Sequence, residues 1–260
     1  MSALEPGLLV LAGVAAGLTG SVAGLASLVS YPALLATGIP PVSANVTNTV
    51  ALVFNSVGSV SASRPELTGQ RPRLVRLAAA GLLGGAAGAT LLLVTPADAF
   101  QKVVPVLIAG ASVMLLAQRP PRELASEGAH LQAGHPHAGH RASWGLTAAT
   151  FAISVYGGYF GAAAGVLMLA TFLLTTGEGV PRSNALKNVV LGVANSVAAV
   201  AYAFLADVDW LAALPLAVGF FIGGRLGPAV VRRAPQTLLR RVIAVAGLGL
   251  ALQLALTAYR

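Results

Sequence analysis

Long apolar runs alternate with short polar segments along the whole chain. A helix that spans a bilayer needs about 20 mostly apolar residues, and runs of that order recur from end to end. None of them has the alternating pattern in segments of about ten residues that is typical of a membrane β-barrel. The pattern therefore predicts an all-α polytopic membrane protein with apolar runs at 7–36, 43–62, 74–95, 101–118, 144–176, 183–206, 210–231 and 238–258.

Composition excludes several other classes of protein. Of the 260 residues, 56% are hydrophobic and 9% are charged, whereas soluble domains carry about 25% charged residues. The absence of cysteine excludes disulfides and thiol catalysis. A net charge of +8 would suggest nucleic acid in a soluble protein, but here the basic residues cluster between apolar runs, as in cytoplasmic loops. We expect a multi-pass protein of the inner (plasma) membrane, with the lipid bilayer and no nucleic acid as partner, and with its first run kept in the mature fold.

The two halves of the chain repeat the same residues at an offset of 139–141 positions. The matched pairs are Gly20 with Gly161, Gly24 with Gly165, Pro41 with Pro181, Asn48 with Asn188, Asn55 with Asn195, Gly84 with Gly223 and Pro96 with Pro235. Such ordered self-similarity indicates a duplicated unit. We expect a first transmembrane repeat in 1–118, a cytoplasmic histidine-containing linker in 119–143 and a second transmembrane repeat in 144–260.

The distribution of Lys and Arg predicts how the two repeats are oriented. If every run crosses once, the loop and terminal cations divide 8 to 6 between the two sides. If 7–36 and 144–176 each enter and return, they divide 12 to 2, and the positive-inside rule favours this arrangement. The halves are then inverted repeats, an architecture of transporters that bind substrate near the midplane. Each repeat would be a broken or re-entrant helical segment followed by three transmembrane helices. The pattern leaves open whether each broken segment is a re-entrant hairpin or a pair of short helices.

Glycines interrupt both of the returning runs, at Gly17, Gly20 and Gly24 and at Gly157, Gly158, Gly161 and Gly165. One interpretation is close helix packing through small residues. The other is a broken helix, whose free amide groups at a half-helix N-terminus attract an anion. Because the clusters are matched between repeats, we favour the second and expect the backbone at Gly20, Gly24, Gly161 and Gly165 to line a site.

Three motifs resemble the signatures of one known family. The segment 41–51 (PVSANVTNTVA) is similar to the first-half signature of the sulfite exporter TauE/SafE-like family of anion permeases, also called the 4-toluene sulfonate uptake permease family. The segments 156–169 (YGGYFGAAAGVLML) and 184–188 (NALKN) resemble its second-half signature. The similarity covers essentially the whole chain, although 22–26 (VAGLA) carries fewer glycines than is usual in the family.

The resemblance implies transport of sulfite, sulfoacetate or another organosulfonate, with no cofactor. We expect a secondary transporter working by alternating access, because the chain has no phosphate-binding Gly-rich loop for ATP. A passive anion channel and a carrier of another small organic anion remain alternatives. An enzyme is not expected, because every histidine and nearly every carboxylate lies outside the apolar runs.

Apart from cations near the ends of the runs, at Arg76, Lys102, Arg240 and Arg241, only Lys187 and Arg225 are cationic within the apolar runs. A cation near the midplane costs about 2.5–3.5 kcal/mol on insertion scales, so each needs a partner. For Arg225 we expect snorkelling or a bond to helix-end carbonyls. For Lys187 both snorkelling and contact with a bound anion stay open.

Asparagines share one helical face in each repeat. Asn184, Asn188 and Asn195 follow helical spacing, and Asn48 and Asn55 repeat it with Thr47 in place of Lys187. Such side chains donate hydrogen bonds to anion oxygens or to a neighbouring helix. The candidate substrate contacts are Ser27, Thr47, Asn48, Asn55, Tyr159, Asn184, Lys187, Asn188 and Asn195.

The linker contains three closely spaced histidines, His135, His137 and His140. Such a cluster can bind zinc or nickel, but no cysteine or carboxylate accompanies it, so we expect a linker and no metal site. The sequence leaves a homodimer open.

Overall fold

The structure, a computed structural model, describes residues 5–134, 139–231 and 236–258. Within these ranges the chain forms twelve helices and no strand, which confirms the prediction of an all-α protein. The helices are α1 (Glu5–Ala23), α2 (Ala26–Ala36), α3 (Pro41–Ala62), α4 (Arg64–Leu67), α5 (Arg71–Val94), α6 (Ala97–Ala117), α7 (Pro121–Gly134), α8 (Gly139–Tyr159), α9 (Ala164–Thr176), α10 (Val180–Leu205), α11 (Trp210–Val231) and α12 (Gln236–Ala258).

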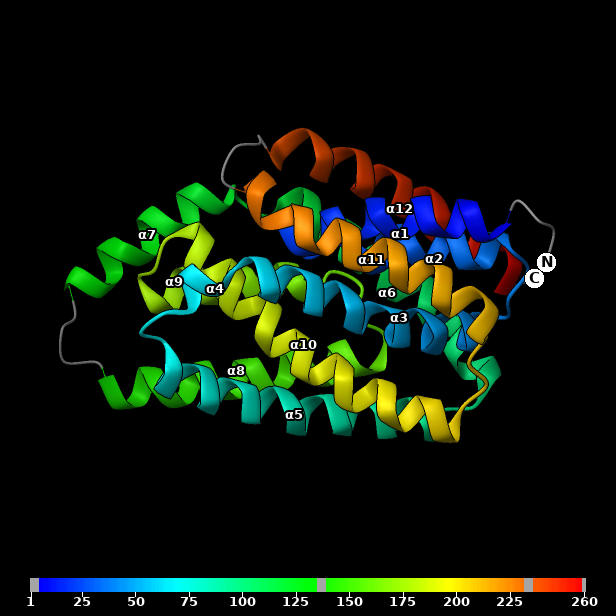
Figure 1. Cartoon of the computed structure of the whole chain (residues 1–260), viewed down its shortest axis with the longest axis horizontal. Coiled ribbons are helices and arrows are strands. Elements are labelled where there is room, and N and C mark those ends of the chain that lie inside the picture. Colours follow the sequence, from blue (N-terminus) through cyan, green and yellow to red (C-terminus); the bar gives the residue numbers. More distant parts are fainter. Residues whose placement is uncertain (1–4, 135–138, 232–235, 259–260) are drawn as a thin grey trace.

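Two of the apolar runs are each divided into a pair of helices. The run 7–36 becomes α1 and α2, and the run 144–176 becomes α8 and α9. Figure 1 shows α1 and α2 entering from the end of the molecule where α12 ends, and α8 and α9 entering from the opposite end. The other long helices, α3, α5, α6, α10, α11 and α12, run along the length of the bundle. Each divided run is therefore a helical hairpin that turns back inside the protein.

Five helices in the described part of the chain are long and apolar enough to cross a membrane: α1, α5, α6, α10 and the Trp210–Ala229 part of α11. The 22-residue α3 has a similar length but is more polar, because it buries Asn45, Asn48, Asn55 and several hydroxyl side chains. These polar groups face other helices, so α3 is polar toward the protein interior.

Glycines bring two pairs of parallel helices into close contact. Along α1 and α11, a Cβ at Gly17 would lie 2.8 Å from the Phe220 carbonyl oxygen and 2.9 Å from the Gly224 nitrogen. Along α5 and α8, a Cβ at Gly158 would lie 2.5 Å from the Gly85 carbonyl oxygen. This is packing through small residues. The expectation that Gly17, Gly20, Gly157 and Gly158 interrupt helices is therefore wrong, since all four lie inside α1 or α8.

The linker between the halves contains a helix that packs on one hairpin. Leu124 of α7 is buried against Leu169 and Leu173 of α9. At the far end of α7, the Gln132 side-chain amide donates a hydrogen bond of 3.0 Å to the Thr175 carbonyl oxygen. The linker helix α7 is thus attached to the second hairpin near both of its ends.

The two ends of the bundle differ in their charged contacts. At the end where α8 enters, Glu178 pairs with Arg73 at 3.4 Å and with Arg182 at 3.0 Å. Arg225 is exposed and donates a 3.1 Å hydrogen bond to the Ser61 hydroxyl near the same end, as expected for a snorkelling cation. At the opposite end Asp209 caps α11, because its carboxylate accepts a 3.0 Å hydrogen bond from the Ala212 amide.

Candidate functional site

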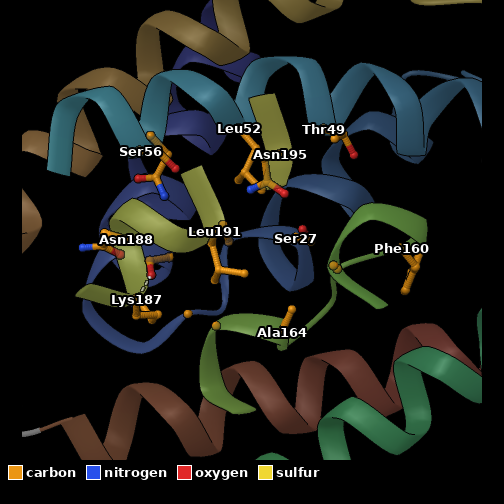
Figure 2. A pocket seen from close by; sticks show the side chains of 17 residues that line it. Ser27, Thr49, Leu52, Ser56, Phe160, Ala164, Lys187, Asn188, Leu191 and Asn195 are labelled. Atoms are coloured by element: carbon orange, nitrogen blue, oxygen red, sulfur yellow. Dashed lines mark hydrogen bonds between the residues drawn. The ribbon is translucent and has the colours of Figure 1, made fainter. Parts of the chain in front are cut away.

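A partly open cavity lies where the two hairpins turn. Its volume is about 40 Å³. Figure 2 shows labelled side chains reaching it from α3, α10 and both hairpins. The lining residues are Gly20, Gly24, Ala26, Ser27, Thr49, Leu52, Asn55, Ser56, Gly157, Phe160, Gly161, Ala164, Gly165, Lys187, Asn188, Leu191 and Asn195.

The helix breaks depend on backbone conformations that favour glycine. Gly24 between α1 and α2 has φ +77°, and Gly161 between α8 and α9 has φ +75°. The two hairpins touch at this level, because a Cβ on Gly24 would collide with the backbone of Gly165. All four glycines predicted from the repeat to lie at the site, Gly20, Gly24, Gly161 and Gly165, line the cavity.

The N-termini of α2 and α9 both begin at the cavity wall. Ala26 and Ser27 are the first residues of α2, Ala164 and Gly165 are the first of α9, and all four line the cavity. The first turns of a helix carry free N–H groups and roughly half a positive charge. Two such ends at the wall of one cavity favour an anion, although the amides of Leu28, Ala164 and Val166 already donate to nearby carbonyl oxygens.

The C-termini of α1 and α8 end at the same level, where side chains from the other half of the chain hold their last carbonyl groups. The Lys187 ammonium donates hydrogen bonds to the carbonyl oxygens of Gly20 at 3.1 Å and Ser21 at 3.3 Å, and the Asn184 amide donates one of 2.8 Å to Ser21. At the end of α8, the Tyr159 carbonyl oxygen accepts a 2.9 Å hydrogen bond from the Asn45 side-chain amide of α3.

Tyr202 makes a second contact to the end of α8, where its hydroxyl donates to the Gly158 carbonyl oxygen. A cation is favourable at a helix C-terminus because it offsets the partial negative charge there. The negative ends of the half-helices are therefore partly neutralised, whereas the first residues of α2 and α9, at the positive ends, line the cavity.

Lys187 is the one charged side chain among the described residues that line the cavity. It is 1% exposed, and no carboxylate in the described part of the chain lies within ion-pair distance of it. Its contacts to Gly20 and Ser21 use two of the three N–H groups of an ammonium. Lys187 is thus both a cap for α1 and a source of positive charge in the cavity wall.

Three of the predicted asparagines, Asn55, Asn188 and Asn195, line the cavity. The Asn188 Nδ2 and Asn55 Oδ1 atoms are buried and have no hydrogen-bond partner among the described residues. Buried polar atoms are nearly always hydrogen-bonded, so the Asn188 amide is a donor suited to bind an anion. The Asn55 Oδ1 atom is an acceptor and lies beside Gly224 of α11, so it does not supply such a donor. Of the nine predicted side chains, the ones at the cavity are Ser27, Asn55, Lys187, Asn188 and Asn195.

The other four predicted side chains lie outside the cavity lining. Asn48 is held by two serines of α2, because it donates to Ser27 Oγ at 3.1 Å and accepts from Ser30 Oγ at 2.6 Å. Thr47 Oγ1 accepts a 2.9 Å hydrogen bond from the Asp209 amide.

Asn184 is one of the residues that hold the end of α1. Tyr159 places its ring 5.9 Å from that of Phe100, centroid to centroid. Thr47, Asn48, Tyr159 and Asn184 therefore have structural contacts in this conformation, so the expectation that they line the site together with the other five is not met.

Part of the cavity wall was not predicted from the sequence. Thr49, Leu52 and Ser56 of α3 line the cavity, and Phe160 and Leu191 complete its apolar side. The three α3 residues are spaced i, i+3 and i+7, which places them on one helical face. That face adjoins the Asn48–Asn55 face, so the helical spacing was a usable signal.

The histidine cluster of the linker falls where side chains are not described. His135 and His137 lie outside the described residues, and so does the side chain of His140. In the described ranges, no group of three His, Asp or Glu side chains is close enough to hold a metal ion.

Comparison with known proteins extends over nearly the entire chain. The family model for the sulfite exporter TauE/SafE matches residues 9–254. The probable membrane transporter protein YfcA of Escherichia coli (strain K12) is 25% identical over 249 residues, covering 94% of this chain and 87% of the relative, and the YfcA of Escherichia coli O157:H7 matches equally. No solved structure matches the chain significantly. The chain therefore belongs to the sulfite exporter TauE/SafE family, a family of multi-pass plasma-membrane transporters and not of enzymes, as its sequence motifs predicted.

Proposed function

We propose that this transporter is a secondary carrier that moves a small sulfur-containing anion, such as sulfite or an organosulfonate, by alternating access. The observation that carries the proposal is the convergence of two helix N-termini and the Lys187 ammonium on one partly open cavity. Amide groups of Asn188, Asn195 and Asn55 supply further polar contacts there. A sulfite or sulfonate group offers three acceptor oxygens, which match donors of these kinds.

The pairing of helices supports an inverted-repeat organisation. The first hairpin packs on α11 of the second half, and the second hairpin packs on α5 of the first half. With α3, α5 and α6 as counterparts of α10, α11 and α12, the two halves exchange their hairpins in the same way. Residues 1–118 and 144–260 are then the two repeats, joined by the linker 119–143. In such transporters one unit rocks against the other around a central site.

The charged ends of the bundle support a cytoplasmic placement of the linker. The Arg64–Arg76 segment, the linker helix α7 and Arg182 all lie at the end where α8 enters. Asp207 and Asp209 lie at the opposite end, in the loop before α11. The positive-inside rule assigns the first end to the cytoplasm.

A flux assay in proteoliposomes tests the proposal. Purified protein is reconstituted, and uptake of sulfite, sulfoacetate, taurine, sulfate and a sulfur-free organic anion is measured with and without the same anion on the far side. A carrier gives saturable uptake that anion on the far side accelerates. A passive channel gives conductance that does not saturate, and preference for a sulfur-free organic anion would point to the other alternative. Absence of saturable flux for every sulfur anion would overturn the proposal.

A further inference from the structure

We propose that Gly157 determines how large an anion the cavity accepts, and that the chain is selective for a compact oxyanion over sulfonates with a carbon chain. This inference rests on the proposed function, because it names the residue that sets the substrate size at the same site. Gly157 lies in α8 and lines the cavity.

A side chain at position 157 would occupy free space in the cavity. A Cβ there would lie 3.7 Å from the Ala164 Cβ and 3.8 Å from the Leu191 Cδ2, which are ordinary van der Waals distances. Both of these neighbours line the cavity, and Figure 2 shows their side chains on adjoining parts of its wall. A methyl group at this position would therefore fit without displacing protein atoms, and it would take its room from the cavity.

The other glycines of the cavity wall are needed for the fold itself. Gly24 and Gly161 have positive φ values of +77° and +75°. A Cβ at Gly20 would lie 2.6 Å from the Ala26 Cβ, and one at Gly165 would lie 2.5 Å from the Gly24 Cα. Among the glycines of the cavity wall, only Gly157 has a backbone position that tolerates a side chain. Its missing side chain therefore keeps cavity volume free and is not required by the backbone conformation.

The volume of the cavity sets the scale of the anion. A single water needs about 10–15 Å³, so the 40 Å³ cavity has room for about three or four water-sized groups. Sulfite has four heavy atoms, whereas sulfoacetate adds a methylene and a carboxylate. Pockets that enclose larger organic ligands measure about 300–1,000 Å³. One extra methyl group is therefore a large fraction of the available space.

The test compares Gly157→Ala with Gly110→Ala. Gly110 lies in α6, is exposed, and has nothing within 4 Å of the position of its Cβ, so this control makes the same substitution in a helix without changing the cavity. Both substitutions favour helix formation, and thermal unfolding in detergent checks that both proteins are folded. Binding of sulfite, methanesulfonate and sulfoacetate to each purified protein is measured by calorimetry.

We expect the wild type and Gly110→Ala to bind sulfite best and to lose affinity as the anion lengthens. Gly157→Ala should bind sulfite roughly 5- to 150-fold more weakly, the range expected for one methyl group forced into a filled site. Leu191→Ala, which enlarges the cavity from the neighbouring wall, should raise the affinity for methanesulfonate relative to sulfite.

Two results separate the failure of this inference from that of the proposed function. If the wild type binds sulfite and Gly157→Ala binds it equally well, Gly157 does not set the size and this inference alone is wrong. If the wild type binds none of the three anions, the proposed function fails and the size argument fails with it.

Discussion

Replacing Lys187 by Gln tests whether its positive charge acts on the transported anion. Gln is one atom shorter than Lys and keeps an N–H donor, but it removes the charge. Lys187 is 1% exposed, and its ammonium lies 3.1 Å from the Gly20 carbonyl oxygen in the cavity wall. A hydrogen bond to a charged group contributes about 1.5–3 kcal/mol, which corresponds to about 10- to 150-fold in affinity.

The assay is the Kd for sulfite, measured on monodisperse protein in detergent and checked by uptake in proteoliposomes. Arg225→Gln is the matched control, because it also removes one positive charge from an apolar run, but at an exposed side chain that lies outside the cavity lining. We expect Arg225→Gln to keep the wild-type Kd. Asn188→Ala should raise the Kd less than Lys187→Gln does, since a neutral hydrogen bond contributes about 0.5–1.5 kcal/mol.

Lys187→Arg separates charge from shape, because the charge remains while the compact ammonium becomes a wide planar group. Partial activity in Arg and little in Gln would support an electrostatic role at a shaped site. The reasoning is refuted if all three variants at positions 187 and 188 bind sulfite as the wild type does. In that case Lys187 serves only as a cap for α1, and a lower melting temperature of Lys187→Gln would be its sole effect.

Three further predictions concern topology, the linker and the helix break. Single cysteines at positions 130 and 236 of this cysteine-free chain should react with an impermeant reagent from the cytoplasmic side, and one at position 207 from the other side; labelling of 130 and 236 from opposite sides would contradict the inverted-repeat proposal. Replacing the three clustered linker histidines by Ala should leave transport and melting temperature unchanged, and a metal-dependent rise in melting temperature that this change abolishes would show a metal site instead. Gly24→Ala should prevent stable assembly, because it adds a collision with Gly165 to the strain of φ +77°. The control Gly38→Ala, with φ +84° and nothing within 4 Å of its Cβ position, should cost only about 1–2 kcal/mol of stability. Equal melting temperatures for the two variants would refute the close contact of the hairpins. The linker variant replaces His135, His137 and His140 by Ala together, and the glycine variants replace Gly24 or Gly38 by Ala one at a time.

The positions of the helices follow closely from the apolar runs. Proline lies at the first or second position of α3, α5 and α10, where its missing N–H costs nothing, and this marks their starts. The places of the helix breaks were less accessible, because glycine serves both close packing and chain reversal. Gly17 and Gly24 look alike in the sequence, yet only Gly24 has a positive φ. At the second break Ala163 also has a positive φ of +59°, and an alanine gives no signal in the sequence for that conformation.

The repeat predicted only part of the site, because the two halves are not equivalent in detail. Asn48 and Asn188 occupy matched positions, but Asn48 is bonded to Ser27 and Ser30 of α2. At the 141-residue offset that matches the glycines, the counterparts in α9 are Met168, which has no hydroxyl, and Thr171, whose hydroxyl donates to the Leu167 carbonyl oxygen. The Asn188 amide is therefore left to line the cavity. The difference was readable from the sequence only once α2 and α9 were known to pack beside these two asparagines.

The exchange of hairpins between the halves has a consequence for how the protein is made. The surface of α1 that bears Gly13 and Gly17 is covered by α11, and the last carbonyl groups of α1 are held by Asn184 and Lys187. Ribosomes must synthesise residues 24–209 before α11 begins, which takes about 10–40 s at roughly 5–20 residues per second. During that interval the first hairpin lies in the membrane or at the translocon without the side chains that bond the last carbonyl groups of α1, and without α11 against its glycine surface. Folding of the N-terminal half is thus completed by the C-terminal half, and a ribosome that stalls before α10 leaves a segment that quality-control proteases can recognise.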